Sequence, residues 1–181
     1  MDDENFFDNE ESLKNLKLLG AAIMATESSA INKRSSPTGC KGLMQFCGAA
    51  AEEEGLCSNK CSYGSDDNRE LPSLAIPAGI KHFLRKASYF DGYTYQEVFG
   101  LAAYNGGQVT IKKAIAKTGK DNPTWQEVKD KLTKDVLKDA SPGLYGKWSS
   151  SQLDDKIKEI KCYPYKVYQY KKEFESLGLF T

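Results

Sequence analysis

The chain has 181 residues, which is enough for one domain with a sizeable core and argues against two. Hydrophobic residues make up 40% of it and charged residues 28%, as in ordinary soluble globular proteins and unlike disordered or fibrous ones. The 25 basic side chains equal the 25 acidic ones, so there is no basic excess for general nucleic-acid binding, and no apolar run is long enough for a membrane span.

The chain begins with acidic residues, MDDENFFDNE, which lack the positive segment and the apolar core of a secretory signal. We expect residues 1–10 to form a flexible acidic leader, followed by a single domain over residues 11–181. The expectation is therefore a chain without a secretory signal of its own.

Apolar side chains recur at helical spacing over residues 13–24 and predict a first helix, which carries Glu27 near its C-terminal end. A polar stretch over residues 32–39 is rich in turn-forming residues. A second helix is predicted from residue 41 to a stop at Gly55. Because a carboxylate beside the apolar side chains of both helices is poorly solvated, we expect Glu27 to have the raised pKa that a general acid needs.

Residues 56–72 form a long predicted loop, in which one short β-hairpin is conceivable. A third helix is predicted over residues 74–89, with Leu74 facing inward and Pro77 in the first turn. This helix carries His82, the only histidine. We expect His82 to pack or to lie on the surface rather than to act as a base, because no partner for a nucleophile is evident.

The rest of the chain is also predicted to be helical, and Thr124 with Glu127 fits a capping box. No segment alternates at period two over the length of a strand. The predicted fold is therefore all-α, with at most one short hairpin. The predicted helices span residues 95–103, 109–117, 124–137, 151–161 and 166–177.

Five cysteines occur, and the odd number leaves at least one thiol unpaired within the chain. Their spacing lacks the CxxC pairs of structural zinc sites, and the domain is large enough to fold without disulfides. Reduced thiols are therefore favoured, with one disulfide or a metal site as alternatives. The cysteines are Cys40, Cys47, Cys57, Cys61 and Cys162.

Four short motifs occur in a fixed order: ESS at residues 27–29, SPTG at 36–39, GLMQF at 42–46 and LAAYNGG at 101–107. Together they resemble the catalytic core of the soluble lytic transglycosylases, lysozyme-like enzymes that cleave the glycan strands of peptidoglycan. The resemblance extends over residues 15–175. It implies an all-α, lysozyme-like catalytic domain whose partner is the peptidoglycan strand and which uses no metal and no cofactor.

The resemblance also implies a mechanism with Glu27 as the sole catalytic carboxylate. Glu27 would protonate the oxygen of the β-1,4 bond between N-acetylmuramic acid and N-acetylglucosamine. As carboxylate it would then take the proton of the sugar's own 6-hydroxyl, giving a 1,6-anhydro product. The N-acetyl group of the substrate would replace an enzyme nucleophile.

The same resemblance suggests which residues contact the glycan. Tyr104 would place its hydroxyl near Glu27, and Gln45 would offer a donor and an acceptor to an acetamido group. Tyr163 and Tyr165 are competing candidates for a C-terminal tyrosine that faces the acid. Core packing or a local turn is the simpler explanation for several of them. The expected substrate-binding residues are Ser28, Ser36, Met44, Gln45, Phe46, Tyr104, Asn105 and Tyr165.

Two other functions stay open on the sequence alone. A goose-type lysozyme would hydrolyse the same bond, with Asp66, Asp67 or Glu70 as a second carboxylate, although ordinary loop polarity explains these acids better. A non-catalytic glycan-binding or structural module is the other, and Ala75 favours it because the family pattern has an asparagine there. The expected lack of a secretory signal favours a phage particle component or a phage lysin, with other phage or envelope proteins as partners.

Overall fold

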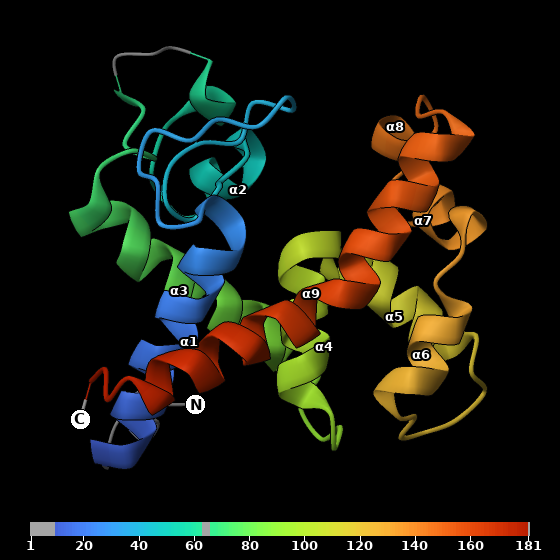
Figure 1. Ribbon diagram of the computed structural model, residues 1–181. Helices are drawn as coiled ribbons and strands as arrows, with labels where there is room; N and C mark the ends of the chain where they lie inside the picture. The colour runs from blue at the N-terminus through green and yellow to red at the C-terminus, as the bar shows by residue number, and fades with distance from the viewer. Residues whose placement is uncertain (1–9, 63–65, 181) are drawn as a thin grey trace. The chain divides into compact units, whose positions relative to one another are not determined.

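The computed structural model describes residues 10–62 and 66–180, and in these residues it contains helices and no strands (Figure 1). This confirms the predicted all-α fold. The described part of the loop at 56–72 holds a 3₁₀ turn rather than a hairpin, and isolated bridges occur instead between Ser35 and Lys41 and between Lys41 and Phe46. The elements are α1 (Glu10–Ser28), α2 (Gly48–Glu53), η2 (Asn59–Cys61), α3 (Pro72–Ser88), α4 (Gln96–Gly106), α5 (Gln108–Ala116), α6 (Trp125–Lys131), α7 (Lys134–Ala140), α8 (Pro142–Tyr145) and α9 (Ser150–Ser176).

The chain forms two compact units. The first unit contains the residues up to Lys81 together with those from Lys166 onward, and the second contains His82–Tyr165. The predicted leader over residues 1–10 lies outside the described residues except for Glu10, which begins α1. That residues 11–181 form a single domain stays a prediction.

The first unit is built around the apolar face of α1 and the loop that follows it. Gly79 of α3 has no side chain, and the thioether of Met44 occupies that space: a Cβ at Gly79 would lie 2.2 Å from its Cε atom. This close approach joins α3 to the loop. The buried apolar residues of the unit include Leu18, Leu19, Ala22, Ile23, Met44, Phe46, Leu56 and Ala75.

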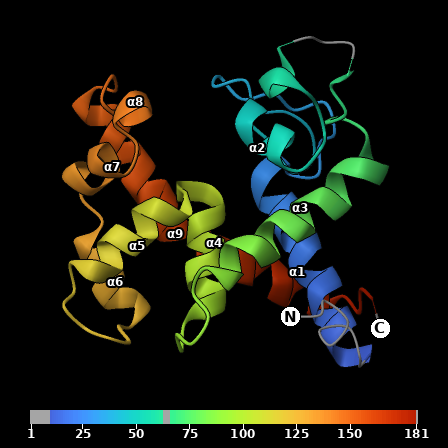
Figure 2. The ribbon, with the colours of Figure 1, turned by 180° about the vertical axis from the view of Figure 1, so that it is seen from behind.

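The second unit has its own core, in which α5 packs against α4, α6 and α7 (Figure 2). Aromatic rings meet edge to face at its centre, with the Phe90 and Phe99 centroids 5.7 Å apart, a favourable arrangement for two rings. The predicted capping box at the start of α6 is present, because Thr124 Oγ1 accepts from the Glu127 N–H and the Glu127 carboxylate accepts from the Thr124 N–H. The core also includes Ile111, Ala114, Val128, Val136, Leu137, Leu153 and Ile160.

Two predicted boundaries near the N-terminal motifs are wrong. The second helix is only α2, because residues 41–47 form turns in which Gly42 and Gln45 have left-handed φ values of +78° and +48°. The third helix begins at Pro72, so Pro77 lies in its second turn rather than its first, and Leu74 is 48% exposed rather than buried.

Two further boundaries depend on tertiary packing. The helix predicted over residues 124–137 is two helices, because Leu132 takes an extended conformation and Thr133 caps α7. The helices predicted on either side of Pro164 are the single helix α9. Burial of Tyr163 and Val167 beside the proline favours a continuous helix over the break that proline usually causes. Within the described ranges, no helix combines the length and apolarity needed to cross a membrane.

Candidate active site

Glu27 is the penultimate residue of α1 and is partly buried. The helix ends just after it, because Ser29 and Ala30 take left-handed φ values of 54° and 58°. Ser28 is buried and donates its hydroxyl hydrogen to the carbonyl of Met24 at 3.1 Å. Ser28 thus makes a local hydrogen bond, and its expected contact with the substrate stays a prediction. The carboxyl group of Glu27 belongs to a helix end where the chain turns sharply.

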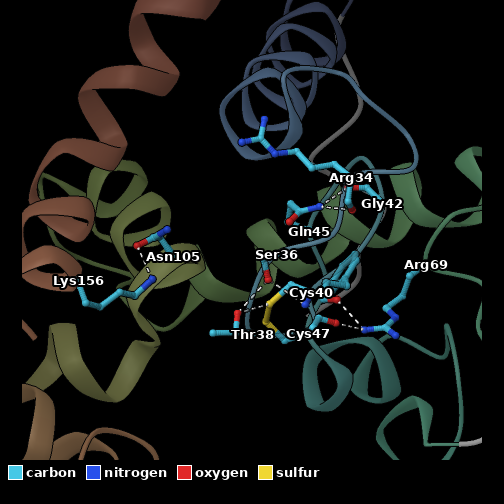
Figure 3. Close-up of a disulfide and its surroundings, with 12 residues drawn as sticks. Arg34, Ser36, Thr38, Cys40, Gly42, Gln45, Cys47, Arg69, Asn105 and Lys156 are labelled. Carbon is cyan, nitrogen blue, oxygen red and sulfur yellow. Dashed lines mark hydrogen bonds between the residues drawn. A yellow bond between two sulfur atoms is a disulfide. The ribbon is translucent and has the colours of Figure 1, made fainter. Parts of the chain in front are cut away.

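The segment of residues 36–46, called here the motif loop, carries the SPTG and GLMQF motifs (Figure 3). Ser36 closes its first turn: its Oγ accepts from the Cys40 N–H at 3.0 Å and shares a hydrogen bond of 2.9 Å with the Thr38 hydroxyl. The Lys41 N–H donates to the Phe46 carbonyl at 3.1 Å and closes the second turn. Ser36 thus shapes the motif loop, and its expected contact with substrate stays a prediction.

Gln45 is also engaged inside the motif loop. Its side-chain nitrogen donates to the carbonyl oxygens of Arg34 and Gly42, each at 2.8 Å (Figure 3). Met44 and Phe46 are only 1% and 3% exposed, so the core packing considered for them is what the structure shows. Because the side-chain nitrogen of Gln45 already donates two hydrogen bonds, only its side-chain oxygen remains as the group predicted to bind the substrate.

Two disulfides lie in this part of the first unit, joining Cys40 to Cys47 and Cys57 to Cys61, with Cα–Cα distances of 4.0 and 5.2 Å. The prediction of reduced thiols is therefore wrong for four of the cysteines, and only Cys162 is free. Cys40 and Cys47 flank the bridge between Lys41 and Phe46, which brings them together, an effect of the turn conformation that spacing alone does not reveal.

Asp66 and Asp67, two of the three loop acids considered as a second carboxylate, make structural contacts. Asp67 accepts from both the Nε and Nη2 atoms of Arg69 at 2.7 Å, and from Lys41 at 3.2 Å. These hydrogen bonds, chiefly those from Arg69, hold the pKa of Asp67 well below its usual value. Hydrogen bonds from the Ser58 hydroxyl and N–H likewise lower the pKa of Asp66. The explanation as loop polarity is therefore supported.

Arg69 is a residue that sequence reasoning missed. Its side chain is 5% exposed, and its Nη1 atom donates to the carbonyl oxygens of Gly39 at 2.9 Å and Phe46 at 3.1 Å. An arginine two positions after an aspartate in a polar loop is a weak signal, because surface ion pairs have the same pattern. Only its burial distinguishes Arg69 from an arginine in an ordinary surface ion pair.

In the second unit, Tyr104 and Asn105 lie in the last turn of α4. The Asn105 side chain is held by α9. It accepts from Lys156 at 3.1 Å (Figure 3) and donates to Glu159 at 2.7 Å. The Tyr104 ring stacks on Tyr163, with centroids 6.2 Å apart. Asn105 is thus fixed by a polar network within the second unit, and its expected contact with the substrate stays a prediction.

The competing tyrosines of α9 differ in environment. Tyr163 is 3% exposed and packs on Tyr104, whereas Tyr165 is 65% exposed.

His82 meets the Tyr104 ring edge to face at 5.3 Å, and its Nδ1 atom accepts from Arg85 at 2.9 Å. Burial lowers the pKa of His82 to about 4, assisted by the charge of Lys86, so it is neutral at pH 7, as its expected packing role requires.

The predicted site residues divide between the two units. The first unit holds Glu27 with the motif loop, and the second holds Tyr104, Asn105 and Tyr165. That the Tyr104 hydroxyl approaches Glu27 stays a prediction. Ala75, where the resemblance implies an asparagine, is a buried residue of α3 with 1% exposure.

Comparison with known proteins addresses the predicted family directly. The model of the Transglycosylase SLT domain family matches residues 4–126, more than half of the chain. The peptidoglycan transglycosylase gp16 of Escherichia phage T7 is 39% identical over 83 residues, which amount to 46% of this chain and 6% of that protein. The match spans a small part of the relative's length. The predicted resemblance is confirmed, and the chain belongs to the Transglycosylase SLT domain family.

Proposed function

We propose that this protein is a peptidoglycan lytic transglycosylase with Glu27 as its sole general acid and base. The observation that carries the proposal is the family match, which spans α1, the motif loop and α4 and so includes Glu27, Gln45 and Tyr104. The substrate is the β-1,4 bond between N-acetylmuramic acid and N-acetylglucosamine in the glycan strands. No metal or cofactor takes part in the proposed reaction.

In this mechanism Glu27 donates its proton to the glycosidic oxygen while the bond from that oxygen to C1 of the muramic acid breaks. The N-acetyl oxygen of the same sugar stabilises the oxocarbenium-like centre, so no second enzyme carboxylate is required. The 6-hydroxyl oxygen then bonds to C1, and the Glu27 carboxylate takes its proton. The products are a 1,6-anhydro end and a free 4-hydroxyl, and no water is consumed.

Two acids of the 66–70 segment, Asp66 and Asp67, support a lyase over a hydrolase. A goose-type lysozyme needs an aspartate that positions water, but Asp67 is bound to Arg69 and Lys41, and Asp66 to Ser58. Their lowered pKa values reflect these contacts and suit structural carboxylates rather than a catalytic base. The phage relative, whose name specifies a peptidoglycan transglycosylase, makes a phage setting the proposed context.

Digestion of purified peptidoglycan tests the proposal. Wild type, Glu27→Gln and a control, Glu52→Gln on the exposed side of α2, are compared by mass analysis of the released products. Anhydro-muropeptides are expected from wild type and the control, with the rate of Glu27→Gln lower by a factor of about 10²–10⁴.

Other products would favour the remaining functions. Reducing ends from wild type that disappear in Glu27→Gln would indicate a goose-type lysozyme. No product from wild type, together with equal glycan binding by wild type and Glu27→Gln, would leave a non-catalytic binding or structural module.

A further inference from the structure

Arg69 connects its own segment to two positions of the motif loop. Its Nη1 atom donates to the carbonyl of Gly39, in the SPTG turn, at 2.9 Å, and to the carbonyl of Phe46, the last residue of GLMQF, at 3.1 Å. Its Nε and Nη2 atoms both donate to Asp67 at 2.7 Å. Asp67 reaches the motif loop as well, because it accepts from Lys41 at 3.2 Å. One buried guanidinium thus crosslinks the backbone of the loop to residues 67–69.

On the basis of the proposed function, we propose that Arg69 is a positioning residue: oriented by Asp67, it holds the motif loop in the shape that binds the glycan strand. Arginine suits this task because its planar guanidinium presents donors in a rigid fork, with one side for a carboxylate and the other for carbonyl oxygens. A lysine ammonium in the same place lacks the bidentate geometry that fixes its direction.

The motif loop needs such support because its conformation is not one that its residues prefer. Gln45 has a φ of +48°, in the left-handed region that residues other than glycine seldom occupy. The loop residues 41–47 contain no helix, so the hydrogen bonds of that region come from turns and side chains. Such a conformation persists only when the surrounding structure determines it.

The Cys40–Cys47 disulfide and Arg69 restrict different motions. The disulfide joins Cys40, within the motif loop, to Cys47, the residue that follows it, with Cα atoms 4.0 Å apart. Arg69 instead ties the loop to the neighbouring segment. The approach is close: a Cβ at Gly42 would lie 1.9 Å from the Arg69 carbonyl oxygen. Loss of the guanidinium would therefore free the loop to move as a closed ring.

The test compares Arg69→Lys and Asp67→Asn with wild type. A control, Asp139→Asn, removes an exposed ion pair with Lys113 in the second unit. Turnover of soluble, uncross-linked glycan strands is measured well below the unfolding temperature of every variant, and amide hydrogen exchange is followed over residues 36–46.

We expect Arg69→Lys and Asp67→Asn each to raise KM about tenfold. If the motif loop has its binding shape for only about one tenth of the time, the apparent affinity falls to about one tenth. Exchange in the motif loop should accelerate by at least about the same factor, since it reports the population of the open form, which rises to about nine tenths from a small fraction in wild type. The kcat should change by less than about threefold, and the control should match wild type throughout.

Unchanged KM and unchanged loop exchange in both variants would overturn the inference. A lower unfolding midpoint with wild-type KM would show that Arg69 only stabilises the fold. If Arg69→Lys does not fold, Asp67→Asn decides, because it leaves the guanidinium in place and removes the charges that orient it, together with the ion pair between Asp67 and Lys41. Wild type that releases no product would refute the proposed function, while loop exchange would still test the clamp.

Discussion

Gly42→Ala is expected to destabilise the protein more than Gly39→Ala, although both glycines belong to the motif loop and have φ values of +78° and +80°. An alanine in this left-handed region costs about 1–2 kcal/mol at either position, because its Cβ crowds the following carbonyl oxygen. The two positions differ in their surroundings. A Cβ at Gly42 would lie 1.9 Å from the Arg69 carbonyl oxygen, whereas a Cβ at Gly39 would meet nothing within 4 Å.

The additional cost at Gly42 is that of overpacking against backbone, about 1–3 kcal/mol, so its total is about 2–5 kcal/mol. Urea unfolding followed by circular dichroism gives both values under one set of conditions. The KM of Gly42→Ala should also rise, since the clash separates the loop from Arg69. Equal losses of stability in the two variants would refute the close approach as the reason for glycine at position 42.

Three further predictions concern stability. Folding lowers the pKa of Asp67, so its stabilising contribution is complete above its unfolded pKa near 4 and is lost as the pH falls through the lower folded value. Urea midpoints at pH 7, 5 and 3 should show this loss in wild type and less of it in Asp67→Asn. Replacing Cys40 and Cys47 by serine should cost about 2 kcal/mol by loop closure over their separation of 7 residues, measured by urea unfolding; reductant should cost wild type at least as much, because it also opens Cys57–Cys61. Thr124→Ala should cost about 1 kcal/mol by removing the N-cap of α6, measured by thermal unfolding, whereas Thr124→Ser should cost much less.

Local patterns determined much of this protein from the sequence alone. The 3.6-residue spacing of apolar side chains predicted α1 and placed Glu27 near its end, and Thr124 with Glu127 predicted the start of α6, because helix faces and caps depend on residues only three or four positions apart. The motifs around Glu27 and Tyr104 identified the family, which the match over residues 4–126 confirms.

Contacts between distant residues decided the rest. Arg69 is important because it is buried against carbonyl oxygens 23 and 30 positions away. Cys40 pairs with Cys47, only seven positions away, because the turns between them bring the two together. The helix across Pro164 continues because its neighbours are buried. Pairing, burial and proline tolerance depend on what lies next to a residue in space, and residue spacing carries little information about that.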